Sequence, residues 1–164
     1  MKINLCVLVL LWGAVLPFAH GEEVCVSENP AISAIQKQWQ APQLPGDKDF
    51  AEGFRPTSLQ LLPRSQAENL FGLPSIKSRK TILFFNQYAW TIETDGDYWL
   101  VADSGVWLDV RDGQQALEPI TFNHGLRCAG IYKALKFHLP KGRYVLIVAS
   151  DATDKVKIAA ELER

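Results

Sequence analysis

A nine-residue pattern that occurs twice constrains the fold of this 164-residue chain more than any other feature. Residues 96–104 and 142–150 both read Gly-x-Tyr-x-Leu-x-(Ala/Val)-x-Ser, and each copy follows a strand-like run, residues 90–92 or 137–139, across a tight turn. Strand side chains point alternately to two faces, so one face of each copy lies on a core and carries Tyr98 and Leu100, or Tyr144 and Leu146. The pattern predicts two β-hairpins, and two hairpins in one small domain favour an antiparallel β-sandwich.

The first 21 residues have the composition of a signal peptide. Lys2 provides a positive start, residues 3–18 form an apolar stretch, and Ala19 and Gly21 place small residues where cleavage after Gly21 requires them. The stretch falls short of the ~20 residues that a membrane span needs. We therefore expect a periplasmic or secreted protein that has no stable membrane insertion after cleavage, rather than an anchored one.

The expected mature chain of 143 residues is long enough for one domain with its own core. Loss of Lys2 leaves 16 basic against 18 acidic residues, which does not suggest a nucleic-acid partner because such a surface needs a basic stripe. Residues 22–57 form an N-terminal segment that we expect to pack on the domain, with a short helix or loop over 31–39 after Asn29 and Pro30. Residues 58–164 form the sandwich domain.

Closely spaced strand patterns fill the sandwich domain and predict an all-β, jelly-roll-like fold. The expected strands cover 59–62, 81–85, 88–94, 97–102, 106–110, 117–122, 130–139, 142–150 and 155–162. Lys133 interrupts the apolar stripe of residues 131, 135, 137 and 139. Either a bulge shifts the register there, or the lysine lies at the edge and extends its amine to solvent.

Two cysteines, Cys25 and Cys128, remain in the expected mature chain. Export places them where thiols oxidise, so a disulfide between them is predicted. Closing a loop of about 100 residues would stabilise the fold by about 4 to 5 kcal/mol on the chain-entropy model. Two free buried thiols are the alternative.

Histidines and carboxylates offer limited material for catalysis. His138 lies on the strand face opposite the apolar residues and reads as a surface residue, whereas His124 lies in a loop that ends at Cys128. A metal site would need His124 together with loop carboxylates such as Asp103 or Asp109. The chain contains neither a G-x-S-x-G motif nor a phosphate-binding glycine loop. We therefore assign no catalytic residue and expect no cofactor.

Aromatic residues are the remaining signal. Trp99 and Trp107 fall on the strand faces opposite the core, where exposed tryptophans would form a platform for a sugar or a protein. Alternatively, the N-terminal segment or residues 63–78 fold over them. The candidate binding residues are Trp99, Asp103, Trp107, His124 and Arg127.

Residues 97–162 resemble the C-terminal half of a family of small exported proteobacterial proteins. The matching motifs are Gly96-Asp97-Tyr98, Gly105-Val106-Trp107-Leu108-Asp109-Val110, His124-Gly125, Cys128-Ala129-Gly130-Ile131-x-Lys133 and Phe137-x-Leu139-x2-Gly142-x-Tyr144. Some members carry the label homogentisate 1,2-dioxygenase, which would imply an iron site built from two histidines and a carboxylate. The repeated pattern is also similar to the prepeptidase C-terminal sandwich, a non-catalytic accessory module of secreted proteins.

These observations give three competing hypotheses. The first is an exported, non-catalytic β-sandwich that binds an envelope protein or a glycan. The second is a small metal-dependent enzyme, the dioxygenase label included, that uses His124 with loop carboxylates. The third is a structural envelope protein or an inhibitor of an exported enzyme.

Overall fold

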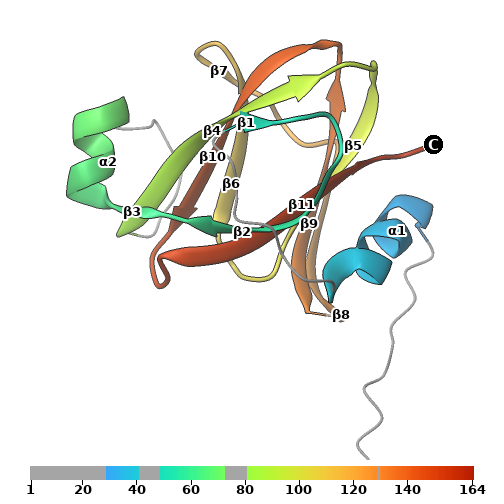
Figure 1. The fold of residues 1–164 in the computed structure, drawn as a ribbon, viewed down its shortest axis with the longest axis horizontal. Helices are drawn as coiled ribbons and strands as arrows, with labels where there is room; N and C mark the ends of the chain where they lie inside the picture. The colour runs from blue at the N-terminus through green and yellow to red at the C-terminus, as the bar shows by residue number, and fades with distance from the viewer. Residues whose placement is uncertain (1–28, 41–48, 73–80, 129) are drawn as a thin grey trace, which may run out of the picture.

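The computed structural model describes residues 29–40, 49–72, 81–128 and 130–164, with side chains for all of these except 124–128. Its strands form two sheets that pack face to face (Figure 1). Sheet A has the order β2 (Phe54–Gln60), β11 (Lys155–Leu162), β5 (Gly96–Ala102), β9 (Ile131–Leu139) and β8 (Thr121–Cys128). Sheet B has the order β1 (Asp49–Phe50), β4 (Phe84–Ile92), β10 (Gly142–Ser150), β6 (Trp107–Asp112) and β7 (Gln115–Ala116), and β3 (Leu62–Pro63) also pairs with β4. The predicted all-β sandwich is confirmed.

The two copies of the repeated pattern form the central strand of each sheet, β5 in sheet A and β10 in sheet B. The predicted hairpins are wrong, because each turn before a copy crosses from one sheet to the other. β4 of sheet B leads into β5 of sheet A, and β9 of sheet A leads into β10 of sheet B. An alternating pattern reports which residues face the core, but it is identical for a hairpin and for a connection between sheets.

Each copy pairs with the strand that precedes the other copy. β5 pairs with β9, placing Gly96 opposite Leu139 and Tyr98 opposite Phe137. β10 pairs with β4 in the same way, placing Gly142 opposite Ile92 and Tyr144 opposite Trp90. The chain thus contains two three-strand units, β4-β5-β6 and β9-β10-β11, and the central strand of each lies between the outer strands of the other.

Several strands begin or end at other residues than the sequence predicted. β2 begins at Phe54, so the expected domain boundary at residue 58 lies within it, and the strands expected over 81–85 and 88–94 belong to the single strand β4. The strand expected over 117–122 begins at Thr121. The residues before it connect the sheets, since the Leu117 N–H donates to Val110 O in sheet B and the Ile120 N–H to Lys136 O in sheet A.

Helix α1 (Pro30–Trp39) confirms the expected N-terminal helix and covers the outer face of sheet A (Figure 1). Asn29 caps its N-terminus by accepting from the backbone N–H groups of Ala31 and Ile32, and Pro30 occupies the first turn, where its missing N–H costs nothing. The helix buries its apolar side against outward-facing residues of the sheet: Trp99, Val101, Ile131, Ala134 and Ala159.

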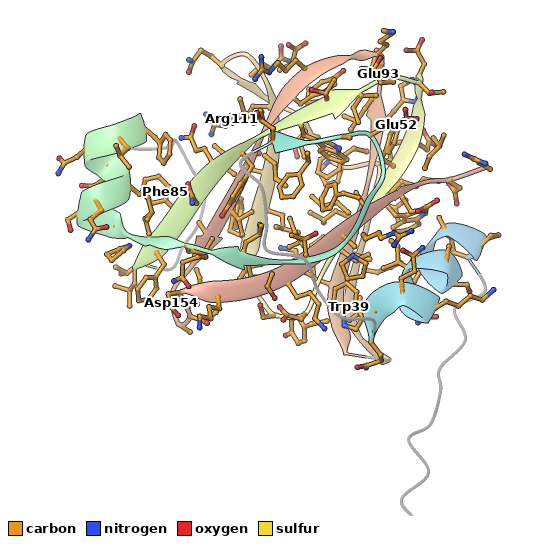
Figure 2. The ribbon with its side chains drawn as sticks, in the orientation of Figure 1. Trp39, Glu52, Phe85, Glu93, Arg111 and Asp154 are labelled. Carbon is orange, nitrogen blue, oxygen red and sulfur yellow. The ribbon has the colours of Figure 1, made fainter. Side chains whose placement is uncertain are left out.

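Helix α2 (Arg64–Phe71) covers part of the outer face of sheet B. Its buried Ala67 packs with Phe85 of β4 and Ala149 of β10, and Trp107 of β6 packs against this cluster. Figure 2 shows Phe85 on the side of the sheet where α2 lies. The two helices therefore cover opposite outer faces of the sandwich. α1 covers Trp99, and Trp107 packs against the cluster to which α2 contributes Ala67.

Candidate functional site

The candidate site lies at the end of the sandwich where the β5–β6 connection and the β8–β9 hairpin meet. Lys133 of β9 pairs with Ala102 at the end of β5 on one side and with His124 of β8 on the other. The sequence indicated Asp103 and Asp109 as loop carboxylates and placed His124 in a separate loop that ends at Cys128. The fold brings the backbone next to Asp103 and that of His124 to the two sides of a single lysine, which the sequence had not marked as functional.

Lys133 is a buried amine with an aromatic environment. Its residue is only 7% exposed, and its Nζ donates a hydrogen bond of 2.9 Å to Val106 O. The Nζ lies 5.4 Å from the ring centroid of Phe122 and 5.9 Å from that of Trp107, within the range of cation–π contacts. Burial lowers the pKa of Lys133 to about 8, because the charged form loses hydration there.

One feature of the sequence indicated this site: Lys133 interrupts the apolar stripe of residues 131, 135, 137 and 139. The apolar residues before and after Lys133 pack in different places. Ile131 packs with α1, whereas Leu135, Phe137 and Leu139 lie between the sheets. The pairing of β8 with β9 shifts its register over the same stretch, between His124 and Cys128. The expected shift in register is confirmed, and the lysine lies on an inner strand of sheet A rather than at its edge.

The two candidate tryptophans do not form one exposed platform. Trp99 is 5% exposed, lies beneath α1, and donates its Nε1–H to Glu163 Oε1 at 3.3 Å. The N-terminal segment thus covers it, as the alternative expectation had it. Trp107 is half-buried, and its buried Nε1 has no hydrogen-bond partner among the described residues. The exposed aromatic ring at this end is Phe122, at 45%.

The remaining candidate residues lie apart. Asp103 is exposed in the β5–β6 connection and accepts from the Ser104 hydroxyl at 3.0 Å, while Asp109 pairs with Arg111 Nε at 3.0 Å on β6. His124 and Arg127 lie on β8, and their side chains are outside the described residues. Where side chains are described, no three His, Cys, Asp or Glu residues gather as a metal site would require.

The edge strand at this end of the molecule, β8, differs from the other edge strands of the two sheets. Edge strands expose unpaired backbone groups, and proteins protect them with charges, prolines or very short strands. The edge strand β2 carries Arg55 and Pro56, and the outermost strands of sheet B, β1 and β7, have two residues each. β8 is an eight-residue edge strand in which residues 121–124 keep a regular register with β9.

Apolar side chains are exposed at the start of β8. Ile120, the residue before the strand, is 56% exposed, and Phe122 lies next to Lys133 at the candidate site. Phe122 is directly opposite Leu135, so its side chain is on the core-facing side of sheet A. The β8 edge, with which no other described strand pairs, therefore carries one exposed apolar residue and directly follows another.

Comparison of the chain with family models, with curated proteins and with solved structures finds no match. Within the described part of the chain, neither helix is long and apolar enough to cross a membrane.

Proposed function

We propose that this protein is an exported, non-catalytic binding module that takes up an extended segment of an envelope protein along the edge of β8. The observation that carries the proposal is the contrast between β8 and the other edges. No other described strand pairs with the outer side of β8, which carries exposed Phe122 and directly follows exposed Ile120, whereas β2 has Arg55 and Pro56. Addition of a strand satisfies the backbone groups, and pockets for alternate side chains provide specificity.

A protein partner is favoured over a glycan by the nature of the exposed side chains. A glycan platform of the expected kind needs exposed tryptophan rings, and Trp99 lies under α1. Ile120 and Phe122, which are separated by two positions, instead suit the side chains of a paired strand. Glycan binding is the competing outcome in the tests below.

Selection from a library of displayed extended peptides tests the proposal. We expect the mature protein to enrich peptides with alternating apolar residues, and Ile120→Lys to lose most of this binding because a lysine protects the edge. Leu70→Lys is the matched control, since Leu70 is a 67% exposed leucine on α2, far from β8 in the fold. Peptides that bind the Ile120→Lys protein as well as the wild type would overturn the proposal.

Export and the disulfide belong to the same proposal. Cys128 ends β8, and the following Gly130, with φ +81°, is packed against Trp39 at the end of α1. Cys25 and the side chain of Cys128 lie outside the described residues, so the Cys25–Cys128 bond stays a prediction. N-terminal sequencing and non-reducing mass analysis of exported protein test cleavage after Gly21 and the Cys25–Cys128 bond.

A further inference from the structure

Three lysines of the described chain contact aromatic rings, and they differ in how their charge is balanced. Lys136 lies over Trp99 and pairs with Glu163 at 2.5 Å and with Asp97 at 3.5 Å. Lys157 lies over Trp39 and donates to Trp39 O at 3.2 Å. Lys133 is the most buried of the three, and no carboxylate of the described residues pairs with it.

A buried cation without a counter-charge is costly, and buried charges in proteins are normally paired. Among the described residues Lys133 has one hydrogen-bond acceptor, Val106 O, although an ammonium carries three donors. The buried Nε1–H of the adjacent Trp107 has no partner among the described residues. Unsatisfied buried donors are rare in native structures, and this one, beside an amine that uses one of its three donors, indicates a site for an acceptor group.

We infer that Lys133, with Trp107 and Phe122 around it, receives a carboxylate of the bound partner; this inference rests on the proposed function and names the group that the site recognises. A carboxylate carries the single negative charge that balances one ammonium. A phosphate would bring up to two negative charges to a site with one cation. Phe122 is half exposed, and its ring lies against the Lys133 amine. The amine is therefore directly beneath a side chain of the molecular surface.

The location of Lys133 favours the terminal carboxylate of an extended segment over an acidic side chain. Lys133 is opposite His124, the last residue of β8 before its register with β9 shifts. A strand added along residues 120–124 loses its regular edge at that point. Its chain end, rather than its middle, would then be level with the lysine, with only β8 between them.

The first test uses small acids and does not depend on strand binding. Lysine amines of the mature protein are dimethylated with an isotope label and followed by NMR during titration with phenylacetate or phenylacetamide. We expect phenylacetate alone to shift the Lys133 signal and to raise its pKa, while the signals of Lys136 and Lys157 stay in place. Equal responses to acid and amide, or no response at Lys133, would overturn the inference. The readout is taken at the Lys133 signal itself because Asp103 and His124, on neighbouring elements, are also ionisable residue types.

The second test compares selected peptides that end in a free carboxylate with the same peptides as terminal amides, and with amides that carry an internal glutamate. A charge-assisted hydrogen bond predicts that the free acid binds roughly tenfold or more tightly than the amide, and that Lys133→Met removes this difference without weakening the amide. Preference for the internal glutamate would assign the carboxylate to a side chain. Binding of oligoglucuronate but of no peptide would assign it to a glycan and overturn the proposed protein partner.

The two proposals can fail separately. Peptides that bind along β8 as acid and amide alike would overturn the carboxylate site and leave strand addition intact. A Lys133 signal that responds to phenylacetate, in a protein that selects no peptide, would support the carboxylate site and overturn strand addition. Phe122→Glu serves as a positive control, because it places a carboxylate beside Lys133 and should block the response to phenylacetate.

Discussion

Tyr98 and Tyr144 occupy the same position in the central strands of the two sheets, and each hydroxyl bonds to a backbone carbonyl four residues earlier. Tyr98 Oη lies 2.7 Å from Thr94 O, and Tyr144 Oη lies 2.8 Å from Pro140 O. Each bond fastens a central strand to the turn through which the chain crosses between sheets. This arrangement is that of the tyrosine corner of β-sandwiches, here present twice.

The two corners differ in one respect that mutation can measure. The Tyr98 hydroxyl also lies 2.7 Å from Glu52 Oε1, so its one proton is shared between a carbonyl and a carboxylate, whereas Tyr144 has its backbone acceptor alone among the described residues. We expect Tyr144→Phe to lower the free energy of unfolding by about 1 to 2 kcal/mol and Tyr98→Phe by about 2 to 3 kcal/mol, because the Tyr98 hydroxyl has a charged acceptor. Denaturant unfolding measures both values, and equal losses would contradict the assignment of Glu52.

Buried tyrosines predict a loss of stability at high pH. Burial raises the pKa of Tyr88 to about 12, and it also raises the pKa values of Tyr98 and Tyr144 above the usual 10. Above pH ~10 the unfolded chain releases these protons while the folded chain keeps them, so the free energy of unfolding falls as pH rises. Tyrosinate absorbance should therefore develop together with the loss of β-sheet circular dichroism. Full ionisation of these tyrosines in a folded protein would contradict the prediction.

Replacement of Lys133 by methionine should stabilise the protein at neutral pH. Below pH ~8 the lysine is charged in both the folded and the unfolded state, so the cost of burying the charge is fully present. Between about 8 and the usual 10.5 the folded state alone releases its proton, and the free energy of unfolding of the wild type should rise. We expect Lys133→Met to gain about 1 to 3 kcal/mol at pH 7 and to lose this pH dependence. Parallel denaturant titrations of both proteins from pH 7 to about 10 measure it, and a destabilised variant would refute the cost we assign to this buried charge.

Acid should loosen α1 before it unfolds the sandwich. A hydrogen bond from Lys136, and then one from Asn29, holds the pKa of Glu163 below its usual 4.5. The stabilisation that these bonds supply is present above that value and is lost as pH falls through the lower pKa of the folded state. Because Asn29 caps α1, protonation of Glu163 releases the start of the helix from sheet A. Hydrogen exchange of the α1 amides should accelerate at acid pH in the wild type, whereas Glu163→Gln should exchange rapidly at all pH values.

The candidate site illustrates how far residue patterns reach. The sequence singled out Asp103, Asp109 and His124, and it identified Lys133 as an interruption of an apolar stripe. It had no means of joining these observations, because the contact of Lys133 with Val106 and Trp107 depends on which strand lies beside β9. Trp99 and Trp107 were correctly placed on the outward faces, but only tertiary packing, such as that of α1 over Trp99, determined how much of each ring is exposed.

The sequence by itself determined the set of core residues, because alternation along a strand depends on local geometry alone. Tyr98, Leu100, Tyr144 and Leu146 are all buried as the repeated pattern required. Tertiary structure alone decided that the two copies lie in different sheets and that each pairs with the strand preceding the other copy. Pairing joins backbone groups that are distant in sequence, and backbone groups are the same for every residue but proline. The repeated pattern could therefore specify two central strands, but not their neighbours.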